Sequence, residues 1–333
     1  MLIIELKFID MNKIAVLTSG GDAPGMNACV RAVIRGAIYH GVDAYGIRYG
    51  YNGMIDGDIY KMKSYSVSNI IQRGGTILKS ARSEMFKTKE GREKAFLQLQ
   101  RRGIEGLIVI GGDGSFTGAS IFYEEFSIPT IGVPGTIDND LYGTDYTIGF
   151  DTAVNTALDA IDKIRDTANS HDRIFFIEVM GRHTGYIALE CGIGGGAELI
   201  MVPETSTSIE DVVHTLEQNS RLSKTSSIVV IAEGDEEGGA IATAAKVKER
   251  MPDKDIRVTT LGHIQRGGAP TARDRILASR LGLAAIEGLL SGKSNMMVGV
   301  VNGKLVYTSF KEGINTNKSL NQELLRMVKI MSI

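Results

Sequence analysis

The sequence predicts an α/β protein made of two doubly wound, Rossmann-like domains, each with a parallel-type sheet covered by helices on both faces. Three observations carry this prediction. Short, continuously apolar runs alternate with segments of helical periodicity along most of the chain. The chain has 333 residues, more than the roughly 250–300 residues that one hydrophobic core usually supports. Of these residues, 40 are glycine, well above the usual ~7%, which indicates tight strand-to-helix turns or places where backbone approaches a ligand.

In the first half of the chain, each expected strand is a short apolar run, and the expected helices show apolar residues at helical spacing. Met26, Val30, Val33 and Ala37, for example, recur three or four residues apart. Strands are expected at residues 14–17, 43–47, 107–110 and 130–133, and helices at residues 26–40, 92–102 and 115–126.

The same alternation continues through the second half. A helix is expected over residues 151–168 because Val154, Leu158, Ile161 and Ile164 share one helical face. Further strands are expected at residues 174–179, 199–202 and 228–232, and further helices at residues 209–221, 239–250 and 275–290. Strands that are apolar throughout and alternate with helices are typical of parallel sheets buried on both faces.

Composition narrows the possible functions. Lysine and arginine number 37 against 39 aspartates and glutamates, a net charge of −2, so we expect no nucleic-acid or membrane partner. No run approaches the ~18 apolar residues of a membrane-spanning helix, and the first 13 residues lack the apolar stretch of a signal peptide. Cys29 and Cys191 share no metal or redox spacing, which favours a reduced, cytoplasmic setting.

Chemistry-bearing side chains concentrate just after the expected strands. Ligands of doubly wound sheets bind beyond the carboxyl ends of the strands. All six segments at such positions combine glycine with a carboxylate or an arginine. The six segments are residues 19–22, 111–115, 134–140, 180–182, 233–234 and 262–266.

The segment 111–115 lies between an apolar strand and a helix start, where glycine backbone can direct N–H groups at a phosphate. Asp113 is then a natural ligand for Mg²⁺, which proteins usually hold with one or two carboxylates together with substrate phosphates. The alternative is an ordinary turn in which Ser115 caps the helix. Gly20 and Gly21 form a weaker candidate of the same kind. Neither loop is followed by the Lys-Ser/Thr pair of a Walker A motif.

Asp138 and Asp140 stand two residues apart in the loop after the strand expected at 130–133. One could accept a proton from an attacking hydroxyl while the other helps to hold metal, as in phosphoryl transfer. An Asx-rich turn is the alternative. Five arginines near strand ends or turns could bind phosphate bidentately, although any one alone could be a solvated surface residue. They are Arg82, Arg173, Arg182, Arg257 and Arg266.

Taken in order, these segments resemble the ATP-dependent 6-phosphofructokinases of the bacterial type, the phosphofructokinase A family. The resemblance runs from about Asn12 to beyond Val301 and rests on the stretch LTSGGDAPGMN at residues 17–27 and on the loops 111–115, 134–140, 180–182 and 262–266. It implies transfer of the γ-phosphoryl group of ATP to the 1-hydroxyl of fructose 6-phosphate, the committed step of glycolysis. Met11 matches the family's usual start, so residues 1–10 are expected to be an N-terminal extension.

The resemblance also implies roles for individual residues. Asp138 is expected to be the general base, with Thr136 and Asp140 in support and with Arg82 and Arg182 stabilising the transferring phosphoryl group. The implied nucleotide site, with Asp113 on Mg²⁺, comprises Gly21, Arg82, Ser83, Gly112, Asp113, Gly114 and Ser115. The implied sugar-phosphate site comprises Thr136, Asp138, Met180, Gly181, Arg182, Glu233, His263 and Arg266, completed by Arg173 and Arg257 reaching in from a neighbouring subunit.

The family's organisation implies an ATP-binding domain of residues 11–148 plus about 264–313, and a fructose 6-phosphate-binding domain of residues 149–263 plus about 314–333. It also implies a homotetramer with active sites shared between subunits, and an effector site for ADP or phosphoenolpyruvate. The expected effector residues are Arg31, Arg35, Arg165, Gly196, Glu198 and Lys224. Ser64, Leu222 and Thr225 stand where the family usually has cations, which favours weaker or altered regulation.

Two glycines indicate the phosphoryl donor. In pyrophosphate-using relatives, aspartate and lysine occupy the positions of Gly114 and Gly135, and a carboxylate at 114 would crowd and repel the α-phosphate of a nucleotide. Glycine at both positions leaves room for ATP. Another kinase with a Gly-Gly-Asp-Gly loop, such as an NAD kinase, would not require Asp138 together with Asp140. A non-catalytic sugar-phosphate-binding regulator should have lost Asp113 or Asp138.

Overall fold

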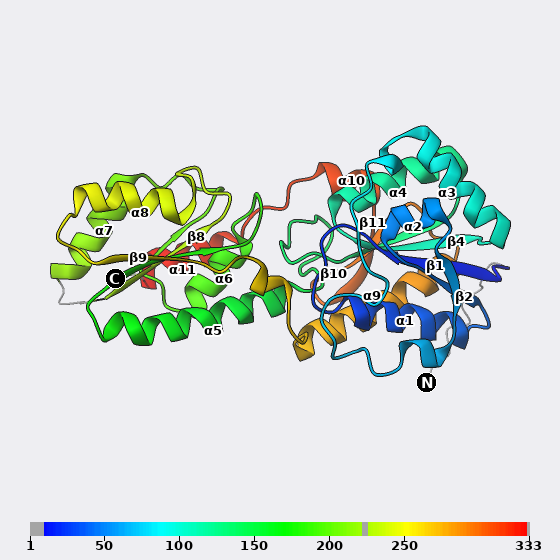
Figure 1. Ribbon diagram of the computed structural model, residues 1–333, viewed down its shortest axis with the longest axis horizontal. Coiled ribbons are helices and arrows are strands. Elements are labelled where there is room, and N and C mark those ends of the chain that lie inside the picture. Colours follow the sequence, from blue (N-terminus) through cyan, green and yellow to red (C-terminus); the bar gives the residue numbers. More distant parts are fainter. Residues whose placement is uncertain (1–9, 222–225, 332–333) are drawn as a thin grey trace. The chain divides into compact units, whose positions relative to one another are not determined.

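The computed structural model describes residues 10–221 and 226–331, which form two compact units (Figure 1). The first unit contains the chain up to Ile137 together with Leu141–Asp151 and Arg266–Asn317. The second contains Asp138–Asp140, Thr152–Gln265 and the chain from Lys318 onward. The loop Asp138–Asp140 thus belongs to the second unit, although its place in the sequence suggested the ATP-binding domain; its contacts, described below, are with residues of the second unit.

A seven-stranded sheet forms the centre of the first unit, in the order β11-β10-β5-β4-β1-β2-β3. All neighbouring pairs are parallel except β2–β3 and β10–β11, which are antiparallel. Ile110 of β4 pairs with Thr18 of β1 on one side and with Val133 of β5 on the other, so these three strands end side by side. The strands are β1 (Lys13–Thr18), β2 (Asp43–Ile47), β3 (Ile59–Met62), β4 (Gly106–Gly111), β5 (Thr130–Pro134), β10 (Met296–Val301) and β11 (Lys304–Ser309).

Helices cover both faces of this sheet, as Figure 1 shows. On one face, α1 (Met26–Tyr39) packs against α9 (Ala272–Leu290). The core under the opposite face is aromatic: Phe116, Phe122 and Phe310 are each at most 1% exposed, and burying such a side chain contributes about 1.5–3 kcal/mol. This core anchors the helix that follows the predicted phosphate loop. The helices on that face are α2 (Gly50–Asp56), α3 (Lys89–Arg102), α4 (Asp113–Phe126) and α10 (Phe310–Asn315).

The second unit has a four-stranded, fully parallel sheet in the order β7-β8-β6-β9. Phe176 and Val229 on its strands are completely buried against α7 and α8, and α5 and α6 lie on the opposite face (Figure 1). The elements are β6 (Ile174–Val179), β7 (Leu199–Met201), β8 (Ser227–Ala232), β9 (Ile256–Thr260), α5 (Phe150–Asn169), α6 (Tyr186–Gly194), α7 (Ile209–Arg221), α8 (Gly239–Arg250) and α11 (Gln322–Met331).

The predicted fold class is confirmed, but local pattern missed several elements. The hairpin β10–β11 turns at Asn302 (φ 49°) and Gly303 (φ 77°), an Asn-Gly pair of the kind that two-residue hairpins favour, so a sequence signal was present. The edge strand β9 is half exposed and therefore carries no continuous apolar run. The other elements not anticipated are α2, β3, α6, α10 and α11.

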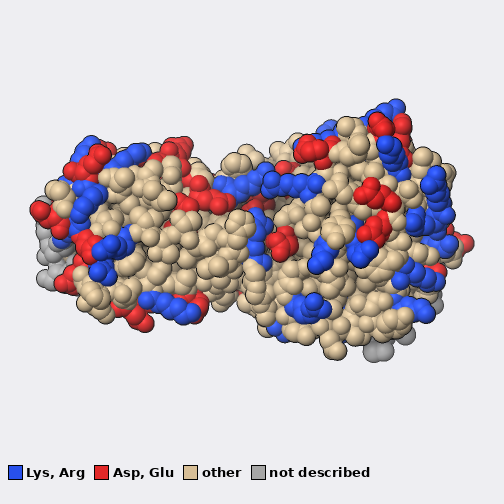
Figure 2. All heavy atoms as spheres, viewed as in Figure 1, with Lys and Arg blue, Asp and Glu red and all other residues tan. Residues whose placement is uncertain are grey.

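The surface carries charges of both signs. On the face drawn in Figure 2, lysine and arginine side chains are interspersed with aspartate and glutamate side chains on each unit, as expected when 37 basic residues meet 39 acidic ones. Among the described residues, no helix is long and apolar enough to cross a membrane.

Candidate functional site

Three loops of the first unit meet where β1, β4 and β5 end. The amide of Ser19 donates a hydrogen bond to the carbonyl oxygen of Ile110 (2.9 Å), and the amide of Gly135 donates to that of Gly111 (2.9 Å). A Cβ atom at Gly111 would lie 2.7 Å from the carbonyl oxygen of Ser19, so only glycine lets the loops pack this closely. The predicted phosphate loop is therefore braced by both of its neighbours.

Helix α4 starts directly at this junction. Gly112 occupies the N-cap position without a side-chain cap, and Asp113 is the first helical residue. The amides of Ser115 and Phe116 donate to the Gly112 carbonyl oxygen. Without a capping side chain, the amides of Asp113 and Gly114 remain available to a ligand beyond the strand ends. Ser115 is buried as the third residue of the helix, so the alternative in which it caps an ordinary turn is wrong.

The residues of this loop fit a divalent cation shared with a phosphate substrate. The Oδ1 atom of Asp113 is buried and has no hydrogen-bond partner among the described residues. Among the residues that the structure describes, no cluster of three or more His, Cys, Asp or Glu side chains could hold a metal ion without a substrate. This donor set suits Mg²⁺, which is usually bound by one or two carboxylates together with substrate phosphates.

The two glycines that bear on the phosphoryl donor differ in the space around them. A Cβ atom at Gly114 would meet nothing within 4 Å. A Cβ atom at Gly135 would lie 3.0 Å from Ile110 Cγ2 and 3.1 Å from Met26 Cε. A Cβ atom is therefore accommodated at position 114, whereas one at position 135 would require its apolar neighbours to shift.

Arg82 and Ser83 lie just before a short 3₁₀ turn, Met85–Lys87. The exposed Arg82 accepts a hydrogen bond at its carbonyl oxygen from Asn52 Nδ2 (3.2 Å), and Ser83 Oγ accepts one from the amide of Phe86 (3.2 Å). These bonds fix the backbone of the segment and leave the Arg82 guanidinium available to a ligand.

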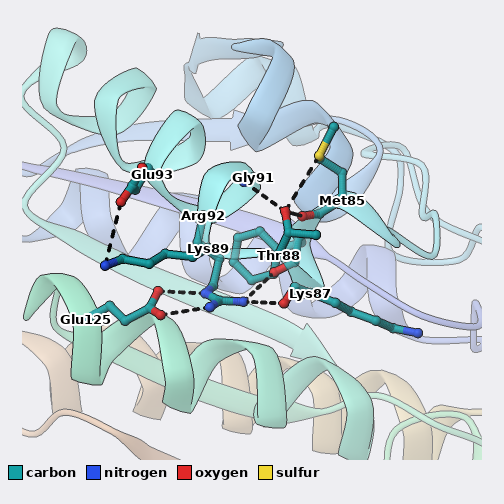
Figure 3. A network of polar contacts seen from close by, with 9 residues as sticks. Met85, Lys87, Thr88, Lys89, Gly91, Arg92, Glu93 and Glu125 are labelled. Atoms are coloured by element: carbon teal, nitrogen blue, oxygen red, sulfur yellow. Dashed lines mark hydrogen bonds and ion pairs between the residues drawn. The ribbon is translucent and has the colours of Figure 1, made fainter.

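A buried arginine braces this segment from behind (Figure 3). Arg92 of α3 donates to the carbonyl oxygens of Phe86 (3.0 Å) and Lys87 (2.7 Å). Its guanidinium also forms a two-point ion pair with Glu125 of α4, at 2.6 and 2.7 Å. The network therefore joins the backbone that follows Arg82 to the helix that begins at Asp113.

Replacing Arg92 by methionine is expected to lower the free energy of unfolding by about 2–3 kcal/mol, because hydrogen bonds to charged groups contribute about 1.5–3 kcal/mol. Urea denaturation measures this change.

Hydrogen bonding by Arg92 lowers the pKa of Glu125 below its ordinary 4.5. The pair's contribution is therefore present above pH 4.5 and is lost as the pH falls through the lowered pKa. Lys94→Met, which removes an exposed pair with Glu90, is the control, and equal stability of both variants would contradict the assignment.

In the second unit, Asp138 is fixed through its backbone. Its side chain is largely buried, with the residue 6% exposed. The Thr184 hydroxyl lies 3.2 Å from the carbonyl oxygen of Asp138 and 3.0 Å from that of Gly181. Thr184, which we did not select from the sequence, therefore connects the predicted base to the turn that carries Arg182.

The turn after β6 places Arg182 in an unusual backbone conformation. Gly181 has φ 152° and Arg182 has φ 58°, and a non-glycine residue in the left-handed region costs about 1–3 kcal/mol. The Arg182 amide donates to Glu233 Oε1 (2.7 Å), and the Thr184 amide donates to the Gly181 carbonyl oxygen (3.0 Å). Glu233 thus helps to hold the turn, while the Arg182 side chain remains exposed.

The two residues expected to support Asp138 precede and follow it in the chain. Thr136 belongs to the first unit, where its carbonyl oxygen accepts from Thr147 Oγ1 (2.6 Å). Asp140 belongs to the second unit, near Tyr186: burial raises the pKa of the Tyr186 phenol, and the charges of Glu204 and Asp140 raise it further.

A buried glutamine, Gln265, holds the expected sugar-pocket residue Met180. The backbone amide of Met180 donates to Gln265 Oε1 (2.9 Å), and Gln265 is completely buried. The short 3₁₀ turn Gly262–Arg266 also carries the exposed His263. Arg266, at its end, belongs to the first unit, where Nη1 lies 3.4 Å from the carbonyl oxygen of Asp22. The sequence offered no signal for Gln265 beyond its place in this segment.

The two arginines expected to reach a neighbouring subunit converge on one carboxylate. Arg173 Nε lies 2.7 Å from Asp255 Oδ2, and Arg257 Nε lies 3.0 Å from Asp255 Oδ1. Hydrogen bonding by Arg173 is the main cause of a lowered pKa of Asp255. Asp255, not anticipated from the sequence, thus holds the two guanidinium groups close together.

Three of the expected effector residues come together in the second unit. Arg165 Nη2 donates to the carbonyl oxygens of Gly195 and Gly196, each at 2.6 Å. Arg165 Nη1 lies 3.6 Å from Glu198 Oε1, and Glu198 Oε2 accepts from the amide of Ile228 (2.6 Å). This cluster is a preformed cation–carboxylate arrangement at the start of β7.

The remaining effector residues are more dispersed. Arg31 and Arg35 lie on successive turns of α1 in the first unit. Partial burial lowers the pKa of Arg31, and the charge of Arg35 lowers it further, as expected for like charges without an anion between them. Lys224, Leu222 and Thr225 lie outside the described residues.

Two doubly wound units, with glycine-rich loops and carboxylates at the strand ends, define an α/β protein of the phosphate-binding class. The family model described as phosphofructokinase matches residues 13–289, and the chain belongs to this family. The "ATP-dependent 6-phosphofructokinase" of Cytophaga hutchinsonii is 58% identical over 319 residues, 96% of this chain and 97% of the relative. The "ATP-dependent 6-phosphofructokinase 1" of Thermus thermophilus is 58% identical over 323 residues, 97% of this chain and 100% of the relative.

Solved structures agree with this assignment. The phosphofructokinase of Saccharomyces cerevisiae superposes with a TM-score of 0.87 at 34% identity, covering 96% of this chain and 47% of the yeast chain. A pyrophosphate-dependent phosphofructokinase of Marinobacter aquaeolei superposes with a TM-score of 0.83 at 25% identity, covering 96% of this chain and 91% of the other. The predicted family and fold are therefore confirmed.

Proposed function

We propose that the protein is an ATP-dependent 6-phosphofructokinase that forms fructose 1,6-bisphosphate and ADP from fructose 6-phosphate and ATP. Near full-length similarity to relatives of that name supports the proposal. The geometric observation that carries it is the Thr184 hydroxyl, which lies against both the Asp138 backbone and the turn of Arg182. A base, Asp138, and a cation, Arg182, whose backbones are connected through Thr184 suit the attack of a hydroxyl on a phosphoryl group.

Each unit is assigned one substrate. The first unit binds ATP through Gly21, Arg82, Ser83 and the loop that contains Gly112 and Asp113. The second unit binds fructose 6-phosphate through the residues after β6, β8 and β9. Asp138 accepts the proton of the 1-hydroxyl while that oxygen bonds to the γ-phosphorus and the bond to the β–γ bridging oxygen breaks, so that ADP leaves.

Arg82 and Arg182 stabilise the negative charge of the transferring group, and Thr136 and Asp140 support Asp138. Asp113 would hold Mg²⁺ together with phosphate oxygens, and the ion, when bound, neutralises part of the phosphate charge. The buried Oδ1 of Asp113 supports this assignment.

We also propose that the enzyme is a homotetramer in which Arg173 and Arg257 contact the 6-phosphate bound by an adjacent subunit. Their convergence on Asp255 supports a shared anion-binding role, because two guanidinium groups this close together favour a doubly charged ligand. A glycolytic kinase is expected to work in the cytoplasm.

The reaction is tested by supplying purified protein with fructose 6-phosphate and Mg²⁺ and offering either ATP or pyrophosphate. Formation of fructose 1,6-bisphosphate, measured through aldolase, is expected with ATP. Turnover with pyrophosphate alone would overturn the choice of donor, and no turnover with either donor would overturn the reaction.

Gly114→Asp is expected to lower kcat/KM for ATP by roughly 10–100-fold, because it places a carboxylate near the nucleotide phosphates. The fold should be unaffected, since a Cβ atom at this position meets nothing within 4 Å. Gly114→Ala, which adds the Cβ atom without charge, is the matched control. Steady-state kinetics with varied ATP measure the effect, and equal losses in both variants would show that bulk rather than charge is responsible.

Regulation by ADP and phosphoenolpyruvate is expected to be weak. The cluster of Arg165, Gly196 and Glu198 is present, but Ser64 supplies no charge where the family usually has a cation. Velocity measured against fructose 6-phosphate with and without each effector should therefore show only small shifts in half-saturation. Activation and inhibition of ordinary family strength would refute this expectation.

A further inference from the structure

We infer that Lys318 is a positioning residue for the proposed general base Asp138 and that it acts through Asn139. The inference rests on the proposed function, because positioning matters for turnover only if Asp138 takes the proton of the sugar hydroxyl. Lys318 begins the part of the chain that returns to the second unit after Asn317, and no motif in the sequence draws attention to it.

The ammonium group of Lys318 binds both oxygen atoms of one residue. Its Nζ donates to the carbonyl oxygen of Asn139 at 3.0 Å and to Asn139 Oδ1 at 2.9 Å. Nζ also lies 5.0 Å from the centre of the Tyr186 ring, within the range of a cation–π contact. Asn139 itself is only 3% exposed. The contacts therefore form a partly desolvated setting in which charged hydrogen bonds are strong.

The residue held in this way has a backbone conformation that needs support. Asn139 has φ 53°, in the left-handed region that asparagine tolerates better than most side chains. Such conformations persist where the surroundings fix them, and they occur often at functional sites. A chelated ammonium group fixes the peptide that follows Asn139 and, through Oδ1, its side chain as well.

Asp138 is consequently anchored at both of the peptide groups that follow it. The Thr184 hydroxyl lies against the Asp138 carbonyl oxygen, on the peptide that joins Asp138 to Asn139. Lys318 holds the next carbonyl oxygen, that of Asn139. If Asn139 relaxed to negative φ, the peptide plane next to Asp138 would rotate and carry the carboxylate with it.

An apolar side chain could replace the packing of Lys318 on Tyr186 but not its donors. Lys318→Met in the full-length enzyme is therefore expected to lower kcat by about 10–100-fold, the cost of misplacing a reacting group by about 1 Å. The KM for ATP and the Kd for fructose 6-phosphate, measured by calorimetry, should change by less than about threefold. Lys318→Arg, which retains donors, should recover most of the loss.

Lys293→Met is the matched control, because Lys293 lies over Tyr307 at 4.9 Å from the ring centre, within the first unit. Its kcat should equal that of the wild type. Asn139→Gly keeps the positive φ and removes Oδ1, so Lys318→Met should cost less in that background than in the wild type. Full additivity of the two substitutions would overturn the coupling between Lys318 and Asn139.

A Lys318→Met enzyme with unchanged kcat would overturn the inference. So would a loss that affects kcat and sugar binding equally and that Lys318→Arg does not rescue. Asp138→Asn, measured alongside, separates a failure of the positioning role of Lys318 from a failure of the proposed general base. If Asp138→Asn is inactive and Lys318→Met is fully active, only the positioning role fails. If Asp138→Asn keeps full turnover, the proposed base fails.

Discussion

Asp138→Asn is expected to lower kcat by about 10²–10⁴-fold, the usual contribution of a general base. Asparagine matches aspartate in shape, and the contact with Thr184 uses the backbone carbonyl oxygen of residue 138, so the loop should keep its conformation. The loss should therefore appear in kcat, with KM for both substrates changed by less than about fivefold. A coupled assay of fructose 1,6-bisphosphate formation, together with calorimetric binding of fructose 6-phosphate, measures both quantities.

The matched control for this substitution is Asp159→Asn. Asp159 is an exposed residue of α5 that pairs with Lys163 one turn away, and its replacement should leave kcat unchanged. Full turnover by Asp138→Asn would exclude the residue as the base. A large loss of sugar binding with unchanged kcat at saturation would instead make Asp138 a binding residue.

The fold class and the ends of the strands where the functional loops lie could be predicted, because both depend on residue patterns that are local in the sequence. Continuous apolar runs identified β1, β4, β5 and β6 to within a residue or two, since strands buried on both faces carry few polar residues. Glycine beside Asp113 predicted a strand-to-helix turn because it stands between an apolar run and a helical pattern, which is also a local signal. The individual roles of Asp138 and Arg182 came from family resemblance and not from spacing.

What the sequence could not supply is the set of long-range partners that hold these residues. Thr184 is 46 residues from Asp138, Gln265 is 85 residues from Met180, and Lys318 is 179 residues from Asn139. None of these pairs has a spacing that a helix or a strand would impose. Each joins residues far apart in the sequence, so the contacts depend on topology and not on local periodicity.

Asp113→Asn tests the other half of the reaction and is expected to lower kcat/KM for ATP by about 10²–10³-fold, because a metal-bound oxygen contributes several kcal/mol to charge stabilisation. The amide that replaces the carboxylate carries no charge to attract Mg²⁺, so more Mg²⁺ should be needed for half-maximal velocity. Titration of activity with Mg²⁺ at fixed ATP measures this directly. Glu124→Gln, at an exposed position of the same helix, is the control.

The two carboxylate variants should also fail in different ways, because Asp113 belongs to the first unit and Asp138 to the second. Asp113→Asn should bind fructose 6-phosphate normally and lose saturation by ATP and Mg²⁺, partly recoverable at high Mg²⁺. Asp138→Asn should saturate with both substrates yet turn over slowly at any Mg²⁺ concentration. An unchanged Mg²⁺ requirement in Asp113→Asn would mean that the buried Oδ1 serves the helix start and not the metal.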